Sequence, residues 1–321
     1  MNKNSPTKKL TRGIPTDFSA AFKKSELYSL YENHKDELFI GVRNNYLNLY
    51  YNCDSIAKIK YTKSSICCEI DKYYTDGKQY KIKPIQICEQ YEEIKKQSDS
   101  KPTPEKKAQS KLVLLNNANK DTNWFCIDVE YVKSFNNQKV KKAADFNGRF
   151  DIIAISKEKP HRVALIELKY GKGAIDGASG IYKHVQDYSK FSDKGFFESH
   201  LKKEIIEIIK CQKELGIAVP LEVPNEDNIL APDFYFITLN NNAKTKNAST
   251  PKQTMAGYLF KDKRWGCKKL STKYCVETEF GDITKKANKF HATFLFSKAT
   301  LGNIEITDII DGEYEERIIP E

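Results

Sequence analysis

Two consecutive apolar segments, residues 149–155 (RFDIIAI) and 162–168 (RVALIEL), constrain the fold of this chain more than any other feature. Apolar residues occupy odd and even positions alike, as they do in strands that are covered on both faces of a sheet. The short polar loop SKEKPH joins the two segments. The pattern predicts a pair of central strands, and a chain of 321 residues is long enough to bury a core around them.

Charged residues stand at one end of this predicted strand pair. Asp151 opens the first strand, and Glu167 and Lys169 close the second. Because side chains alternate between the faces of a sheet, Glu167 and Lys169 share a face. An antiparallel register with Ile155 opposite Val163 also sets Asp151 opposite the glutamate. A shift by one residue would turn Asp151 to the other face.

Two opposed carboxylates in a buried sheet repel each other, because their Cβ atoms lie about 5 Å apart. A hard divalent cation would offset this repulsion, since such ions bind carboxylate oxygens and keep several waters. The ion could bind a phosphate oxygen and lower the pKa of a bound water, while Lys169 orients that water or stabilises charge on phosphorus. The alternative is a salt-bridged hairpin with its charges at a solvent-exposed edge.

Composition and periodicity divide the rest of the chain into segments. We expect a disordered basic tail (1–16), an N-terminal β-rich accessory domain built on a meander (17–97), a polar linker with two prolines (98–107), an α/β core (108–245) and a C-terminal extension of unassigned role (246–321). Further strands are predicted at 124–132 and 233–239, with helices before, between and after the strands of the core. The fold class is therefore α/β (α+β), a mixed central sheet flanked by helices.

The formal charge of +10, carried mostly by lysine, leaves two interpretations open. It suits a polyanionic partner such as nucleic acid, but a solvated lysine-rich surface would carry the same charge. The tyrosines and lysines of the accessory domain either contact bases and phosphates or form cross-strand pairs. The eight cysteines lack CxxC or zinc-type spacing, and no apolar run reaches about 18 residues. We expect free thiols in a cytoplasmic protein without a membrane span.

An aspartate that opens one strand, Glu-x-Lys near the end of the next, and a helix directly afterwards resemble the PD-(D/E)xK nuclease superfamily. The resemblance covers about residues 108–240 and implies a restriction-endonuclease-like core. Glu-x-Lys also occurs at 93–95 and 105–107, but there it lies in a charged helical stretch and in the predicted linker. The resemblance makes Asp151 and Glu167 metal ligands, adds the carbonyl of Leu168, and assigns Lys169 to the attacking water.

The same resemblance implies further site residues. Family members often carry an upstream acidic residue on the first helix; the nearest candidate is Glu130, on a predicted strand face where Asp128 competes with it. A Gln-x-x-x-Tyr motif in some subfamilies is matched only in part by Gln186. On the predicted helix, His184 borders the buried face and Asp187 lies toward solvent. We expect an auxiliary or nucleic-acid-binding role for the set Arg149, Lys172, His184, Gln186 and Asp187.

The family implies a Mg²⁺-dependent phosphodiesterase, with Mn²⁺ able to substitute, that cuts DNA to leave a 5′-phosphate in restriction, phage defence or repair. Two other functions remain open: a non-catalytic nucleic-acid-binding module on the same fold, and a protein-interaction scaffold. The sequence does not decide between DNA and RNA, between exonuclease and endonuclease action, or between a monomer and a homodimer.

Overall fold

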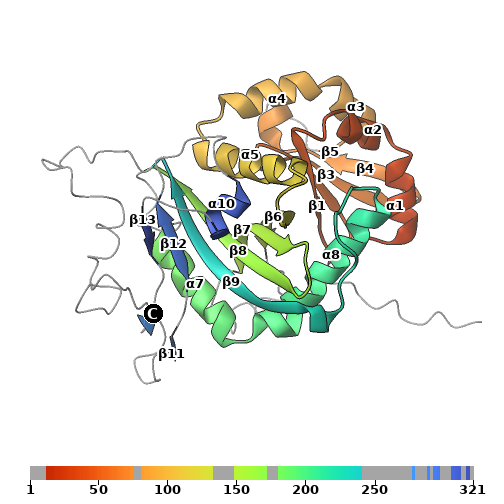
Figure 1. Cartoon of the computed structure of the whole chain (residues 1–321). Helices are drawn as coiled ribbons and strands as arrows, with labels where there is room; N and C mark the ends of the chain where they lie inside the picture. Colours follow the sequence, from red (N-terminus) through yellow and green to blue (C-terminus); the bar gives the residue numbers. More distant parts are fainter. Residues whose placement is uncertain are drawn as a thin grey trace, which may run out of the picture. The chain divides into compact units, whose positions relative to one another are not determined.

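A computed structural model describes residues 12–75, 81–132, 148–171, 180–240, 277–278, 288–289, 292–296, 305–311 and 316–318 (Figure 1). The chain forms two compact units. The first comprises Met1–Lys101 and Lys203–Val223, and the second Pro102–Lys202 and Pro224–Glu321. Residues 203–223, which were expected within the α/β core, therefore belong to the first unit. The predicted fold class, mixed α/β, agrees with the structure at this level.

The first unit is built on a five-stranded antiparallel sheet in the order β1-β2-β3-β4-β5, which confirms the predicted meander. Its strands are β1 (Leu38–Val42), β2 (Leu47–Tyr51), β3 (Asp54–Thr62), β4 (Ser65–Glu69) and β5 (Lys81–Ile82). Its helices are α1 (Thr16–Lys23), α2 (Glu26–Asn33), η1 (Lys72–Thr75), α3 (Pro84–Glu89), α4 (Tyr91–Ser100) and α8 (Lys202–Glu214). The first residue of α8, Lys202, is assigned to the second unit and the rest of the helix to the first.

Residues 12–16 differ from the predicted disordered tail (1–16), whose residues 1–11 lie outside the part of the chain that the structure describes. Gly13 forms a β-bridge with Asn44, and the side chain of Ile14 is buried. The guanidinium of Arg12 donates to the carbonyl of Val42. Local composition indicated a basic tail, but these contacts reach across about 30 residues of sequence, a distance at which a local pattern carries no signal.

The two faces of the first unit's sheet differ in polarity. The face that carries Leu47 and Ile59 is buried, and Phe18 of α1 stacks on Tyr61 with 5.8 Å between ring centroids. The residues that alternate with them, such as Asn48 and Lys58, are half-buried and polar. An antiparallel sheet with one packed and one polar face is expected from this alternation.

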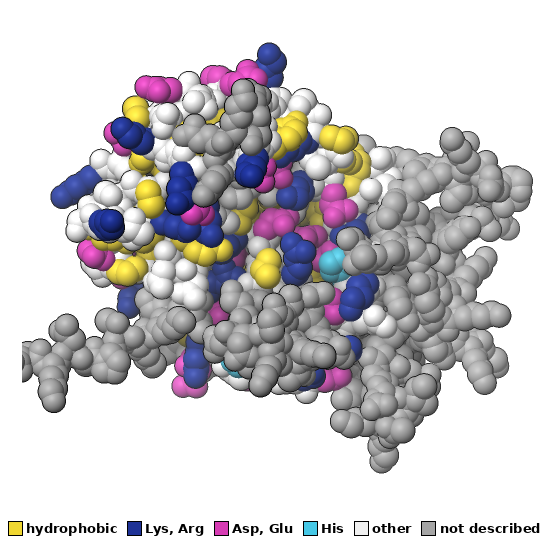
Figure 2. All heavy atoms as spheres, turned by 180° about the vertical axis from the view of Figure 1, so that it is seen from behind, with side chains coloured by type: hydrophobic (Ala, Val, Ile, Leu, Met, Phe, Trp, Pro, Cys, Tyr) yellow, Lys and Arg dark blue, Asp and Glu magenta, His cyan; other side chains and the backbone are white. Residues whose placement is uncertain are grey.

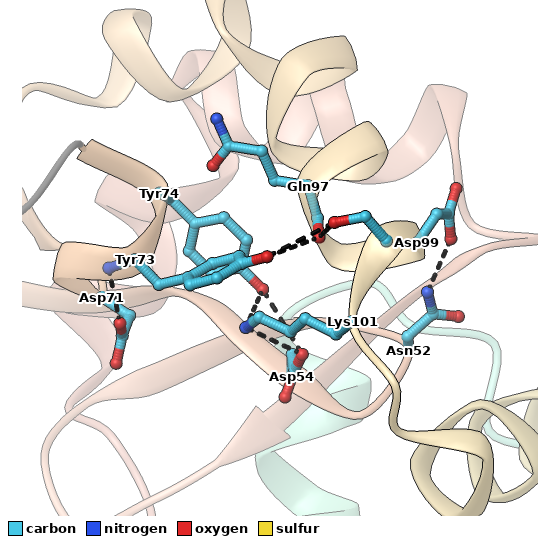
Figure 3. Close-up of polar contacts among 9 residues, drawn as sticks. Asn52, Asp54, Asp71, Tyr73, Tyr74, Gln97, Asp99 and Lys101 are labelled. Atoms are coloured by element: carbon cyan, nitrogen blue, oxygen red, sulfur yellow. Dashed lines mark hydrogen bonds and ion pairs between the residues drawn. The ribbon is translucent and has the colours of Figure 1, made fainter.

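The segment predicted as a linker, residues 98–107, is mostly helical. Helix α4 continues to Ser100, and α5 (Pro104–Ala118) begins with a proline in its first turn, a position where proline lacks only an unused N–H. Figure 3 shows how the chain is held where it leaves α4: the Lys101 ammonium lies 3.1 Å from Asp54 Oδ2 and 2.9 Å from the Tyr74 hydroxyl. The same ammonium lies 4.2 Å from the ring centroid of Tyr73.

The second unit contains a six-stranded mixed sheet in the order β13-β12-β9-β8-β7-β6. The predicted strands are confirmed as β6 (Trp124–Val132), β7 (Arg149–Ser156), β8 (His161–Tyr170) and β9 (Ile229–Leu239). β7 pairs antiparallel with β6 and β8, whereas β8 and β9 are parallel. The helical elements are α5, α7 (Ile181–Asp193), η3 (Phe197–Leu201), η4 (Glu226–Asn228) and α10 (Ile306–Asp311), and Figure 1 shows α7 running along the sheet.

Part of the C-terminal extension completes this sheet. β12 (Thr293–Phe296) lies parallel to β9, and β13 (Glu316–Ile318) pairs with β12. Phe294 is fully buried and stacks on Phe236 with 5.1 Å between ring centroids. The short strands β10 (Glu277–Thr278) and β11 (Asn288–Lys289) form a separate two-stranded sheet. The strand-like segment AGYLF of the C-terminal extension, residues 256–260, lies outside the described residues.

Basic and acidic side chains are interspersed on one face of the described residues. On the face drawn in Figure 2, Lys and Arg side chains lie beside Asp and Glu side chains. The part of the chain that the structure describes contains no helix with the length and apolarity required to cross a bilayer. The described cysteines, at positions 53, 67, 68, 88, 126 and 211, are free thiols, as predicted.

Candidate active site

The predicted register of the central strand pair is confirmed. Ile155 lies opposite Val163, and Ile152 opposite Ile166. At the next position along β7, the Asp151 carboxylate accepts the backbone N–H of Leu168 at 2.8 Å. The end of the strand pair therefore brings the aspartate beside the Glu-x-Lys segment, as the alternation of the sequence indicated.

Glu167 and Lys169 form a buried ion pair at this end of β8. The Lys169 ammonium lies 2.6 Å from Glu167 Oε1. The glutamate is 1% exposed and the lysine 3%. These values exclude the alternative of a hairpin with its charges at a solvent-exposed edge, and they place a charged cluster inside the fold, where burial of an uncompensated charge is costly.

Helix α7 supplies two side chains that hold the Glu167 carboxylate. The Tyr188 hydroxyl donates to Oε2 at 2.8 Å, and His184 Nε2 lies 3.1 Å from Oε1. The two residues are four apart, so they lie on the same helix face. The phenol ring is anchored among aromatic side chains, which are Phe150, Phe234 and Phe236.

The first turns of helix α5 reach the same cluster. Glu105 Oε1 lies 3.1 Å from the Lys169 ammonium, and the side-chain amide of Gln109 donates to the backbone carbonyl of Asp151. Glu105 and Gln109 are also four residues apart and share a helix face. Residues from α5, β7, β8 and α7 thus meet at one point of the second unit.

Burial and mutual repulsion perturb the acids of this cluster. Desolvation, and then the charge of Glu167, raise the pKa of Asp151 well above its ordinary range. Burial also raises the pKa of Glu167, although Lys169 opposes this effect. Perturbed carboxyl groups of this kind are typical of functional sites, because a protein seldom buries excess negative charge without a use for it.

The bases of the cluster have well-defined charge states at neutral pH. Burial would lower the pKa of Lys169, but the charges of the surrounding carboxylates outweigh it and raise that pKa, so the ammonium stays protonated. Burial and the nearby ammonium lower the pKa of His184 to about 4, so its imidazole is neutral. A neutral imidazole with its proton on Nε2 donates a hydrogen bond to the Glu167 carboxylate.

Glu130, the predicted upstream acid, lies on β6 beside Asp151. The pairs that flank it, Val129 with Ile152 and Tyr131 with Phe150, set it at the level of the aspartate. Its φ angle is 50°, and its charge contributes to the raised pKa of Asp151.

The competing acid, Asp128, lies opposite Ile153 and is fully buried. Its Oδ1 accepts the N–H of Val129. Asp128 therefore lies deeper in the sheet than the strand ends, and Glu130 is the better candidate of the two.

The remaining predicted residues have mixed outcomes. Arg149 is exposed at the start of β7, and its charge acts on Glu167. Gln186 is half-buried on α7, and Lys172 lies outside the described residues. The expectation that Asp187 faces solvent is wrong, because it is 3% exposed and pairs with Lys183 at 2.9 Å.

Sequence reasoning missed Glu105 and Gln109, because the two prolines around residue 103 indicated a linker. The available signal was Pro104 followed by helix-forming residues, which is a common helix start. Sequence reasoning also matched the glutamine of the Gln-x-x-x-Tyr motif to Gln186. In the structure, the two helix residues that contact Glu167 are His184 and Tyr188, which have the four-residue spacing of that motif.

The oxygen atoms at this site suit Mg²⁺. Asp151 and Glu167 supply carboxylates, and the carbonyl of Leu168 points to the side of β8 on which its N–H binds the aspartate. Within the described ranges, no three His, Cys, Asp or Glu side chains are grouped closely enough to hold a metal ion. An ion here would depend on two carboxylates and complete its shell with water and substrate oxygens, as Mg²⁺ commonly does.

Comparisons with family models, with curated proteins and with solved structures found no match to this chain.

Proposed function

We propose that this protein is a metal-dependent nuclease of the PD-(D/E)xK superfamily, with a restriction-endonuclease-like core that hydrolyses phosphodiester bonds in DNA. The observation that carries the proposal is the buried pair Glu167 and Lys169 beside the half-buried Asp151, at the end of two paired strands. The order of α5, an antiparallel strand pair and then α7 supports it, because each helix contributes side chains to that set.

The chain's own residues divide the chemistry between them. Asp151, Glu167 and the Leu168 carbonyl would hold the ion, with Glu130 or Glu105 as a further acid. A bound Mg²⁺, or Mn²⁺ in its place, would neutralise the carboxylates and act as a Lewis acid toward the phosphodiester. The protonated Lys169 is suited to orient the attacking water and to stabilise the charge that develops on phosphorus. Attack on phosphorus with loss of the 3′-oxygen leaves a 5′-phosphate.

The position of Lys169 argues against a module that only binds nucleic acid. Affinity for DNA comes mainly from exposed cations that replace counterions along the phosphate backbone. Lys169 is instead 3% exposed and faces Glu167 and Glu105. A binding module has no need to bury a lysine among carboxylates, whereas hydrolysis needs a charged group held beside the reacting phosphate.

The test is cleavage of supercoiled plasmid, linear duplex and single-stranded DNA with Mg²⁺, with Mn²⁺ and with EDTA. Wild type is compared with Asp151→Ala and Lys169→Ala, and the matched controls are Asp121→Ala and Lys210→Ala, which change the same residue types at exposed positions. We expect metal-dependent cutting that both site variants abolish and both controls retain. If wild type binds DNA without cutting it, a non-catalytic binding module is the better account. If wild type neither cuts nor binds DNA, a protein-interaction scaffold is the better account.

A further inference from the structure

Three lysines surround one glutamate on the polar face of the first unit's sheet. The register sets Lys58 of β3 opposite Glu69 of β4, and Glu69 opposite Lys81 of β5. Lys60 lies two residues beyond Lys58 and therefore on the same face. The ammonium groups of Lys60 and Lys58 lie 2.5 Å and 3.8 Å from the Glu69 carboxylate.

These side chains are accessible. The side chains of Lys58 and Lys60 are 37% and 32% exposed, and Lys81 is exposed. The Lys58 ammonium lies 4.4 Å from the ring centroid of Tyr46, which is itself only half-buried. The face therefore presents lysines together with an aromatic ring.

The Glu69 carboxylate is shared by three lysines of this face. The hydrogen bond from Lys60 lowers the pKa of Glu69, and the charges of Lys58 and Lys81 act in the same direction, so the carboxylate is ionised. Among the residues that the strand register places around it, this one carboxylate faces three ammonium groups. Exposed ion pairs contribute little to stability, so folding alone does not account for three lysines at one glutamate.

The spacing suits a phosphate backbone. β3 and β5 are two strand positions apart, which is about 10 Å. Phosphates of one DNA strand advance about 3.4 Å along the helix axis per nucleotide. Flexible lysine side chains across that width can reach several consecutive phosphates, and a tyrosine ring beside them can contact sugar or base.

We propose that the lysine face, defined as Lys58, Lys60 and Lys81 with Tyr46, binds the phosphate backbone of DNA. The proposal rests on the proposed function, because it assigns the first unit a role in holding the substrate of the second. The face supplies affinity without sequence preference, since phosphate contacts carry no base information.

The experiment measures binding of a fluorescently labelled DNA duplex by anisotropy in EDTA, where no cutting interferes, over a series of salt concentrations. The test variant changes Lys58, Lys60 and Lys81 to alanine. The matched control changes three exposed lysines of the same unit to alanine. These are Lys23 and Lys24 at the end of α1 and Lys35 just after α2. We expect the test variant to lose affinity roughly tenfold or more, and its salt slope to fall by about 2 to 3, while the control stays near wild type.

A second variant with arginine at the same three positions keeps the charge and should retain the affinity, which separates lost contacts from lost folding. The proposal is overturned if the alanine variant binds with the affinity and salt slope of the control, or if wild type does not bind duplex DNA. Its failure is distinguishable from that of the nuclease proposal, because cleavage with Mg²⁺ tests the second unit and binding in EDTA tests this face.

Discussion

The hydroxyl of Tyr188 offers the sharpest test of the site geometry. It donates to Glu167 Oε2 at 2.8 Å, while Lys169 and His184 contact Oε1. Tyr188→Phe removes this donor and leaves the ring in place. The aromatic packing of the phenol against its neighbours is therefore preserved, and any effect reports on the hydrogen bond.

The expected loss of stability follows from the burial of both partners, each 1% exposed. A hydrogen bond to a charged group contributes about 1.5 to 3 kcal/mol, and a buried acceptor that loses its donor costs a similar amount. We therefore expect Tyr188→Phe to lower the free energy of unfolding by about 2 kcal/mol. In a unit of roughly 200 residues this corresponds to a fall in Tm of about 4 to 8 °C.

Activity should fall as well, because Glu167 loses one of the contacts that orient it. A misplacement of about 1 Å at a reacting group reduces the rate by up to roughly a hundredfold, so we expect a loss between tenfold and a hundredfold in kcat. The matched control is Tyr91→Phe in the first unit, where the hydroxyl donates to Glu37 at 2.9 Å. The Glu37 side chain is 26% exposed, so water can replace the lost donor, and it retains Lys95 and His34. This variant should therefore lose about 1 kcal/mol or less and keep its activity.

Scanning calorimetry measures the stability of both variants, and plasmid cleavage measures their activity. An unchanged Tm and rate for Tyr188→Phe would refute the geometry, because a buried hydroxyl bonded to a buried carboxylate cannot be removed without consequence. Equal losses of activity in both variants would show that the effect is general and not tied to Glu167.

Three further predictions concern stability. Gly41→Ala should cost about 1 to 3 kcal/mol in urea unfolding, because a methyl group there would lie 2.8 Å from the Tyr50 ring. Phe294→Ala should lower the stability of the second unit by about 3 to 5 kcal/mol in the same assay, since this fully buried ring belongs to its sheet. Partial burial would raise the pKa of Glu37, but the hydrogen bond from Lys95 outweighs it and lowers that pKa. The ionised carboxylate therefore stabilises the fold above about pH 4.3, and this stabilisation is lost as pH falls further. Glu37→Gln should weaken the fall in Tm between about pH 5 and pH 3, as calorimetry across this range can measure.

The register of the central strand pair was predictable because it depends on local alternation. A shift by one residue would have turned the apolar residues of one strand to the wrong face. The pairing of Ile155 with Val163 follows from that constraint, and it brings Asp151 to Leu168 without further information. The strands at 124–132 and 233–239 were found by the same argument.

Local alternation of apolar and polar residues could not predict the role of Glu105. Its contact with Lys169 joins residues 64 positions apart, and two prolines near it favoured a linker. A helix that starts at proline gives a weak signal, and only the packing of α5 against β6, β7 and β8 brings the carboxylate to the site. The spacing of Lys183 and Asp187 does predict an i, i+4 ion pair, which the structure contains, but it does not show that Asp187 is buried.

The charged cluster around Lys169 holds more carboxylates than cations, which is energetically unfavourable in a buried site. The charges of Glu167, Asp151 and Glu105 act on one buried lysine, and Glu130 acts on Asp151. Burial raises the pKa values of Asp151 and Glu167. A structural ion pair would be more stable with one acid per base, since an additional carboxylate such as the half-buried Asp151 loses part of its hydration without a cation of its own. The excess negative charge thus opposes folding, and a bound divalent cation would remove that penalty. This balance of charge supports the proposed metal-dependent chemistry at the ends of the central strands.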